Sequence, residues 1–173
     1  SWKFDAVRQG LQLIRTHRPA VIWSTYPIAT AHLIGAELHR RSGIPWVADF
    51  RDPMAQDGYP RDPATWQQYR AIEQEAMESA SFSMFTTPGA ARVYRERYPV
   101  AAARIMVLEN GYDEESFIEA ERAHQSRPAL NPGALTMLHS GIVYPSERDP
   151  TQLFTALRRL KDAGDVTPGQ LKI

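Results

Sequence analysis

The sequence contains no cysteine among its 173 residues, which excludes disulfides, thiolate metal sites and a thiol nucleophile. It also lacks any apolar run of about 18 residues, the length that a transmembrane helix needs. Lysine plus arginine and aspartate plus glutamate number 20 each, so no excess charge favours nucleic acid. The five histidines show no metal-ligand spacing, and we predict no metal site.

Short apolar runs alternate with helical patterns along the chain. We expect strands at residues 20–25, 45–50, 82–87 and 104–109, and helices at 4–16, 27–41, 62–80 and 88–98. This alternation predicts an α/β fold, a Rossmann-like parallel sheet flanked by helices. Residues 51–61 are rich in proline, glycine and aspartate, which indicates a loop that could form a lid.

A polar stretch divides the chain. We predict a first domain at residues 1–125, a linker at 126–133, and the start of a second Rossmann-like domain at 134–173. In the second domain an apolar run at 134–138 is followed by a loop and by a helix from Thr151, and a further strand begins at Leu171. Because the chain begins without methionine and stops at this strand, we expect it to be an internal fragment of a larger protein.

Polar residues follow the expected strands of the first domain. In open parallel sheets ligands bind beyond the carboxyl ends of the strands, so these residues are candidates for a cleft. Capping of the following helices or a turn explains several of them equally well, and Asn110-Gly111 fits a turn with positive φ. The cleft candidates are Ser24, Thr25, Thr87 and Asn110.

The segment Asp49-Phe50-Arg51-Asp52 places two carboxylates around a guanidinium directly after a strand. Such a group could orient a polyhydroxy substrate or supply a base, which makes Asp49, Arg51 and Asp52 our catalytic candidates. Alternatively, Arg51 pairs with Asp52 or a neighbouring carboxylate and only fastens the loop.

A second candidate site lies after the strand expected at 134–138. Gly141 would let backbone N–H groups approach a diphosphate closely, and Arg148 could neutralise its charge. His139 and Ser140 lie beside this glycine and complete the predicted phosphate-binding group. A tight turn after the strand would also require the glycine.

These pieces, from about Ala20 to Leu160, resemble the GT-B glycosyltransferases of the large retaining group 1 class (family 4). The most specific parts are the segment from Val107 to Asp113 and the run Ser-Gly…Arg-Asp-Pro…Leu-Phe-x-Ala-Leu. The Asp-Phe-Arg-Asp-Pro loop is similar to that of members making bacterial surface polysaccharides. Two features depart from the pattern: Ile142 replaces the usual arginine, and the spacing from Gly141 to Ala156 is one residue longer.

The resemblance implies a retaining enzyme that transfers a sugar from a nucleotide-sugar to a glycan or lipid-linked acceptor, in surface polysaccharide synthesis. Gly141, Arg148, His139 and Ser140 would contact the donor, and Asp49, Arg51 and Asp52 would line the acceptor side. It implies no cofactor besides the donor substrate, no nucleic-acid partner, and a cytoplasmic location with possible peripheral membrane contact. The fragment alone would be inactive, because the paired glutamates that contact the donor sugar in this family are not found.

Two alternatives stay open from the sequence. Another sugar-nucleotide enzyme of similar fold, such as an epimerase, would use the same architecture, since a fold does not determine a function. A non-catalytic module that binds a sugar or nucleotide would retain the cleft without turnover.

Overall fold

The computed structural model describes residues 2–124, 127–144 and 148–173. By internal contacts the chain forms two units, Ser1–Tyr112 and Asp113–Ile173, and each is described by itself. The predicted linker at 126–133 stays a prediction; Gln125 and Ser126 at its start lie outside the described residues. Residues 145–147, which belong to the predicted phosphate loop, also lie outside them.

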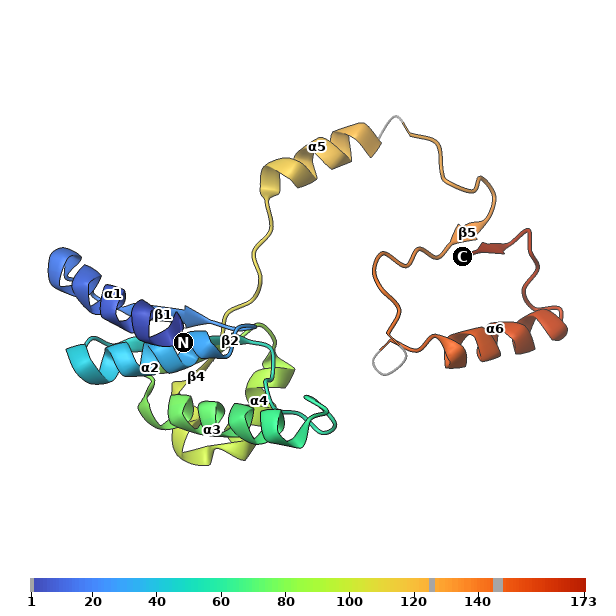
Figure 1. The fold of residues 1–173 in the computed structure, drawn as a ribbon. Coiled ribbons are helices and arrows are strands. Elements are labelled where there is room, and N and C mark those ends of the chain that lie inside the picture. The colour runs from blue at the N-terminus through green and yellow to red at the C-terminus, as the bar shows by residue number, and fades with distance from the viewer. Residues whose placement is uncertain (1, 125–126, 145–147) are drawn as a thin grey trace. The chain divides into compact units, whose positions relative to one another are not determined.

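The first unit is a parallel sheet connected by helices, as the alternating pattern predicts (Figure 1). Its strands pair in the order β1-β2-β3-β4, and every pairing is parallel. The elements are α1 (Trp2–His17), β1 (Ile22–Thr25), α2 (Thr30–Ser42), β2 (Trp46–Arg51), α3 (Pro63–Ser79), β3 (Phe82–Phe85), α4 (Pro88–Arg97), the 3-10 helix η1 (Pro99–Arg104) and β4 (Ile105–Val107).

Most of these boundaries differ from the expected ones by one to three residues, and three of the differences concern the ends nearest the predicted site. Helix α2 begins at Thr30, three residues after Pro27, and Ala29 at its N-cap supplies no side-chain hydrogen bond. Strands β3 and β4 end at Phe85 and Val107, two residues earlier than expected. Thr87 and Asn110 therefore lie beyond the ends of β3 and β4, whereas Thr25, Asp49 and Arg51 lie in the last residues of β1 and β2, at the carboxyl edge of the sheet.

Helices cover one face of the sheet. The inward side chains Trp46, Phe50 and Phe85 are fully buried, and the helix side chains of His32 and Tyr94 pack against them. On the other face, side chains of neighbouring strands are exposed in the described part of the chain. Trp23, Phe82 and Met106 are 50%, 43% and 43% exposed there. The hydrophobic core of this unit thus lies between the sheet and a single layer of helices.

A buried polar cluster sits inside this core. The hydroxyl of Ser24 accepts a hydrogen bond from Trp46 Nε1 and pairs with His32 Nδ1, both at 2.8 Å. Gly35 makes room for the indole, because a side-chain carbon there would lie 2.5 Å from Trp46 Nε1. The other ring nitrogen of His32, Nε2, is buried and has no hydrogen-bond partner among the described residues. Burial without an acceptor disfavours the charged ring and lowers the pKa of His32 to about 4.

The loop after β2 is fastened by a buried carboxylate, Glu73 of α3. Glu73 Oε1 accepts hydrogen bonds from the backbone N–H of Ala55, at 2.7 Å, and from the hydroxyl of Tyr94. The Tyr94 hydroxyl oxygen in turn accepts a hydrogen bond from the backbone N–H of Met54, with an N–O distance of 2.9 Å. Arg97 donates to the carbonyl of Ala55 at 2.7 Å and to Glu73 Oε2 at 3.2 Å. Three backbone groups of the loop are therefore held by side chains of α3 and α4.

The second oxygen of Glu73 is also fully engaged. Arg70 donates to Oε2 at 3.0 Å and Tyr98 donates to it at 2.9 Å. Burial and the charge of Glu73 raise the pKa of both Tyr94 and Tyr98, so the phenols stay protonated and continue to donate. A buried charge of this kind is tolerated only where donors satisfy it, which the two guanidinium groups and two phenols do.

The tip of the same loop is fastened by tyrosines. Gln56 and Tyr59 exchange backbone hydrogen bonds at 2.8 and 3.1 Å. Tyr26, which directly follows β1, meets the ring of Tyr69 edge-on with 6.2 Å between the ring centroids. Burial, and then its neighbour Tyr59, raise the pKa of Tyr26. Met54 and Ala55 are fully buried, so this part of the loop belongs to the core, whereas residues 56–59 at its tip are exposed. The buried part does not fit the lid that the sequence suggests.

The second unit consists of α5 (Glu114–His124), β5 (Leu135–Thr136), α6 (Thr151–Asp162) and β6 (Leu171–Lys172). Strands β5 and β6 pair in parallel, which agrees with the predicted start of a second strand–helix–strand unit. The expected strand at 134–138 is shorter than predicted, because only Leu135 and Thr136 find partners in β6.

We predict that acidification destabilises the first unit through His32. The unfolded chain takes up a proton on this residue below about pH 6.5, while the folded ring resists it until about pH 4. The unfolded state therefore binds more protons between these values, and the free energy of unfolding falls as the pH falls, by up to about 3 kcal/mol. Urea unfolding between pH 7 and pH 4 measures this slope. His32→Asn keeps a polar group beside Ser24 and should flatten it; an unchanged slope would contradict the assignment.

We predict that Tyr94→Phe destabilises the protein by about 1–3 kcal/mol, because it leaves the Met54 N–H without a partner and Glu73 Oε1 with the Ala55 N–H alone. Tyr98→Phe is the matched control: it removes a phenol from the same carboxylate but does not touch the loop backbone. Urea denaturation of both variants should show the larger loss for Tyr94→Phe. Equal losses would mean that the loop contact contributes nothing.

Candidate functional site

The first candidate site lies at the carboxyl edge of β1 and β2. Thr25 and Asp49 are partners in the sheet register, and Thr25 Oγ1 donates to Asp49 Oδ2 at 2.7 Å. The carbonyl of Asp49 accepts the backbone N–H of Tyr26 at 2.9 Å. The threonine therefore orients the carboxylate and leaves Asp49 Oδ1 without a protein donor among the residues described. This oxygen can accept a hydrogen bond from a ligand hydroxyl or act as a base.

Arg51 and Asp52 continue this edge and are both exposed. No ion pair joins Arg51 to Asp52 or to another carboxylate within residues 2–124, so the alternative that Arg51 fastens the loop by a salt bridge is not supported. The backbone is fastened instead, because Thr86 donates to the carbonyl of Arg51 through its N–H and through Oγ1, at 2.9 and 2.8 Å. The backbone of Arg51 is thus fixed at the edge, while its guanidinium has no partner among the described residues.

Two of the three remaining cleft candidates of the first unit, Ser24 and Thr87, have structural roles. Ser24 is buried in the cluster with His32 and Trp46 and does not face the edge. Thr87 is the N-cap of α4 and accepts the backbone N–H of Ala90 at 3.2 Å. Asn110 is exposed after β4, and Gly111 beside it does not adopt a positive φ, so the expected left-handed turn is absent there.

Sequence reasoning missed Glu73 and Thr86. A signal for Glu73 was present, because it shares the buried face of α3 with Ala76 and Met77, which follow at helical spacing. A carboxylate on an apolar stripe indicates a buried, fully paired charge. Thr86 immediately precedes the predicted Thr87, but only the sheet register shows that it faces Arg51.

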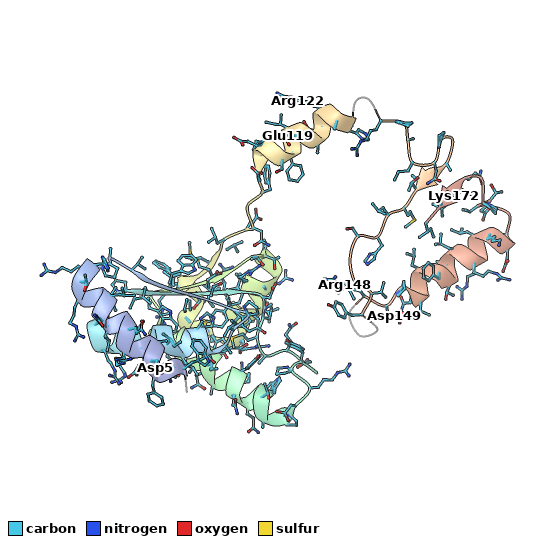
Figure 2. All side chains as sticks on the ribbon, turned by 45° about the horizontal axis from the view of Figure 1, so that its top comes forward. Asp5, Glu119, Arg122, Arg148, Asp149 and Lys172 are labelled. Carbon is cyan, nitrogen blue, oxygen red and sulfur yellow. The ribbon has the colours of Figure 1, made fainter. Side chains whose placement is uncertain are left out.

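The second candidate site lies between β5 and α6 in the second unit, where Figure 2 shows the labelled Arg148 and Asp149 just before the helix. A side-chain carbon placed on Gly141 would lie 3.6 Å from Arg148 Nη1 and 3.7 Å from His139 Nε2. Gly141 adopts a φ of 152°, a conformation that glycine accepts readily. Three of the four predicted phosphate-binding residues therefore lie close together. The fourth, Ser140, lies between His139 and Gly141 in the sequence and is exposed.

Arg148 contacts Tyr144 through both its backbone and its side chain. Its N–H donates to the carbonyl of Tyr144 at 2.9 Å, and its guanidinium lies 5.6 Å from the centroid of the Tyr144 ring. Asp149 is engaged with the helix start, since Thr151 N donates to its Oδ1 at 3.0 Å. The hydroxyl of Thr151 also donates to Oδ1, at 2.5 Å, and this hydrogen bond, followed by the one from the N–H, lowers the pKa of Asp149. The site thus presents an exposed cation beside open backbone, which suits an anionic ligand.

No group of histidine and acidic side chains within the described ranges could hold a metal ion. None of the helices in these ranges is long and apolar enough to cross a membrane.

Comparison with solved structures supports the fold. The chain is similar to the crystal structure of Anabaena HepE in complex with UDP and glucose, with a TM-score of 0.55 and 17% sequence identity. The similarity covers 95% of this chain but 41% of that one, so the chain spans less than half of the length of this neighbour. A comparison with curated proteins finds no match.

Comparison with protein families is more specific. Residues 2–111 match the profile of the glycosyl transferase 4-like domain. This range covers the whole sheet, the loop fastened by Glu73 and the edge that carries Asp49 and Arg51. The resemblance inferred from the sequence is thereby confirmed, and the chain belongs to the glycosyl transferase 4-like domain family.

Proposed function

We propose that the protein transfers a sugar from a nucleotide-sugar donor to a glycan or lipid-linked acceptor. The observation that carries this proposal is the meeting of Gly141, His139 and Arg148 after strand β5, in a chain whose first unit belongs to a glycosyltransferase-type family. An exposed guanidinium beside a glycine backbone has the chemistry needed to hold a diphosphate.

On the donor side, Arg148 would contact the diphosphate and Gly141 would let it approach the backbone. Negative charge develops on the departing nucleoside diphosphate as the sugar bond breaks, and a preorganised cation stabilises it. His139 Nε2 lies close enough to Gly141 to contact the same group. HepE, a structural neighbour, holds UDP and glucose, which makes UDP-glucose the first donor to test.

On the acceptor side, Asp49 would orient or deprotonate a hydroxyl through Oδ1, since Thr25 occupies Oδ2. Arg51 and Asp52 would line the same edge. The retained stereochemistry, the role in surface polysaccharide synthesis and the cytoplasmic location with peripheral membrane contact belong to the proposal through the family resemblance. No step of it requires a metal, and we expect these 173 residues alone to be inactive.

Calorimetric titration with UDP, GDP and ADP tests the donor site. We expect one of these nucleotides to bind and Arg148→Ala to weaken it by about 10- to 100-fold, the loss of one charge-assisted contact of about 1–3 kcal/mol. Arg158→Ala is the matched control, because that arginine of α6 is paired with Asp162. Asp49→Asn should leave nucleotide binding unchanged, since Asp49 is assigned to the acceptor.

Equal binding by the Arg148→Ala variant would remove the phosphate role of this arginine. Binding of none of the nucleotides to a folded protein would contradict the proposed transfer and favour a non-catalytic module.

A further inference from the structure

Arg51 has an unusual backbone conformation for its residue type. Its φ is +59°, in the left-handed region, and the pairing of β2 with β3 shifts register between Asp49 and Arg51. The N–H of Asp52 donates to the carbonyl of Phe50 at 2.6 Å, which closes a three-residue turn centred on Arg51. Turns of this kind with positive φ are rare and strained for residues that carry a Cβ atom.

A second arginine with positive φ has an ordinary explanation. Arg18, with a φ of 47°, directly follows helix α1 and donates its N–H to the carbonyl of Ile14 at 2.9 Å. Helices commonly end on one left-handed residue. Arg51 ends a strand instead, so helix capping does not account for its conformation.

The neighbours of Arg51 hold it in place from both sides. On one side, Thr86 donates two hydrogen bonds to its carbonyl. On the other side, the cluster around Glu73 fixes the backbone of Met54 and Ala55. Strain of this kind persists only where the surrounding structure imposes it, and it is concentrated at functional sites.

The side chain of Arg51 makes no polar contact with the described residues that would offset this strain. It is exposed and makes no ion pair or hydrogen bond with other described residues, while Asp49 is engaged by Thr25. Glycine or asparagine would adopt this backbone with less strain. A guanidinium carries five N–H donors in a planar fork that matches a phosphate or a carboxylate.

We propose that Arg51 is an anion-binding residue, whose guanidinium takes a phosphate or carboxylate group of the acceptor at the carboxyl edge of the sheet. The proposal deepens the proposed function, because the assignment of this anion to an acceptor rests on it. It requires that the acceptor carry an acidic group, as a sugar phosphate or a uronic acid does.

The test is an NMR titration of the full chain, labelled with nitrogen-15, with inorganic phosphate and separately with acetate. We expect saturable shifts at the Arg51 side-chain N–H and at the amides of Asp52 and Thr86, with a Kd in the millimolar range. Saturation by phosphate alone identifies a phosphorylated acceptor, and saturation by acetate alone identifies a carboxylate. Arg51→Gly should abolish the shifts, and Arg51→Lys should weaken binding several-fold because it loses the fork.

Arg51→Gly has a second expected effect. Because glycine relieves the strain, the Tm of the protein should rise by about 2–6 °C while anion binding is lost. Arg18→Gly is the matched control, since it also replaces an exposed arginine with positive φ. It should raise the Tm without changing the titration. Arg51→Asn serves as a second variant that tolerates the same backbone.

The proposal is overturned if neither anion gives saturable shifts, or if Arg51→Gly and Arg51→Asn bind as the wild type does. A lower Tm for both variants would overturn the claim that Arg51 strains the backbone at this position. A parallel titration with UDP distinguishes the two proposals. If UDP does not bind, the donor site is contradicted, but the result for anion binding at Arg51 is unaffected.

Discussion

The buried carboxylate of Glu73 is the constraint on which the first unit depends most. It has no exposure to solvent and accepts hydrogen bonds from one backbone N–H, two phenols and two guanidinium groups. These donors come from α3, α4 and the loop after β2, so one carboxylate joins three segments. Removing one partner would leave a charge or a donor buried and unpaired, which is far costlier than losing an exposed ion pair.

This fastening makes the carboxyl edge of the sheet a fixed frame. Asp49 is oriented by Thr25, and Arg51 is held between Thr86, which directly follows β3, and the loop residues that the Glu73 cluster fixes. A rigid frame suits a binding site, because groups that are already oriented lose little entropy when the ligand arrives. It also explains how a strained arginine is kept: the stable cluster offsets the cost of the strained residue.

The sequence predicted the fold well and the site only in part. Alternation of apolar runs and helical patterns identified each strand near its true position, because buried parallel strands such as residues 46–51 are mostly apolar. Local patterns also indicated Thr87 as a cap. They could not show that Ser24 points into the core or that Glu73 reaches the loop, because these facts depend on register and on contacts distant in the sequence. The positive φ of Arg51 likewise has no signature in its residue type.

The central claim is that Met54 and Ala55, in the loop after β2, are part of the rigid core. Hydrogen–deuterium exchange of the full chain tests it most directly, through the amides of Met54 and Ala55, which donate to Tyr94 and Glu73. The account predicts that these amides exchange as slowly as the amide of Ala48 in the central strand. Rapid exchange of Met54 and Ala55 beside a protected Ala48 would contradict it and would return the loop to the role of a mobile lid.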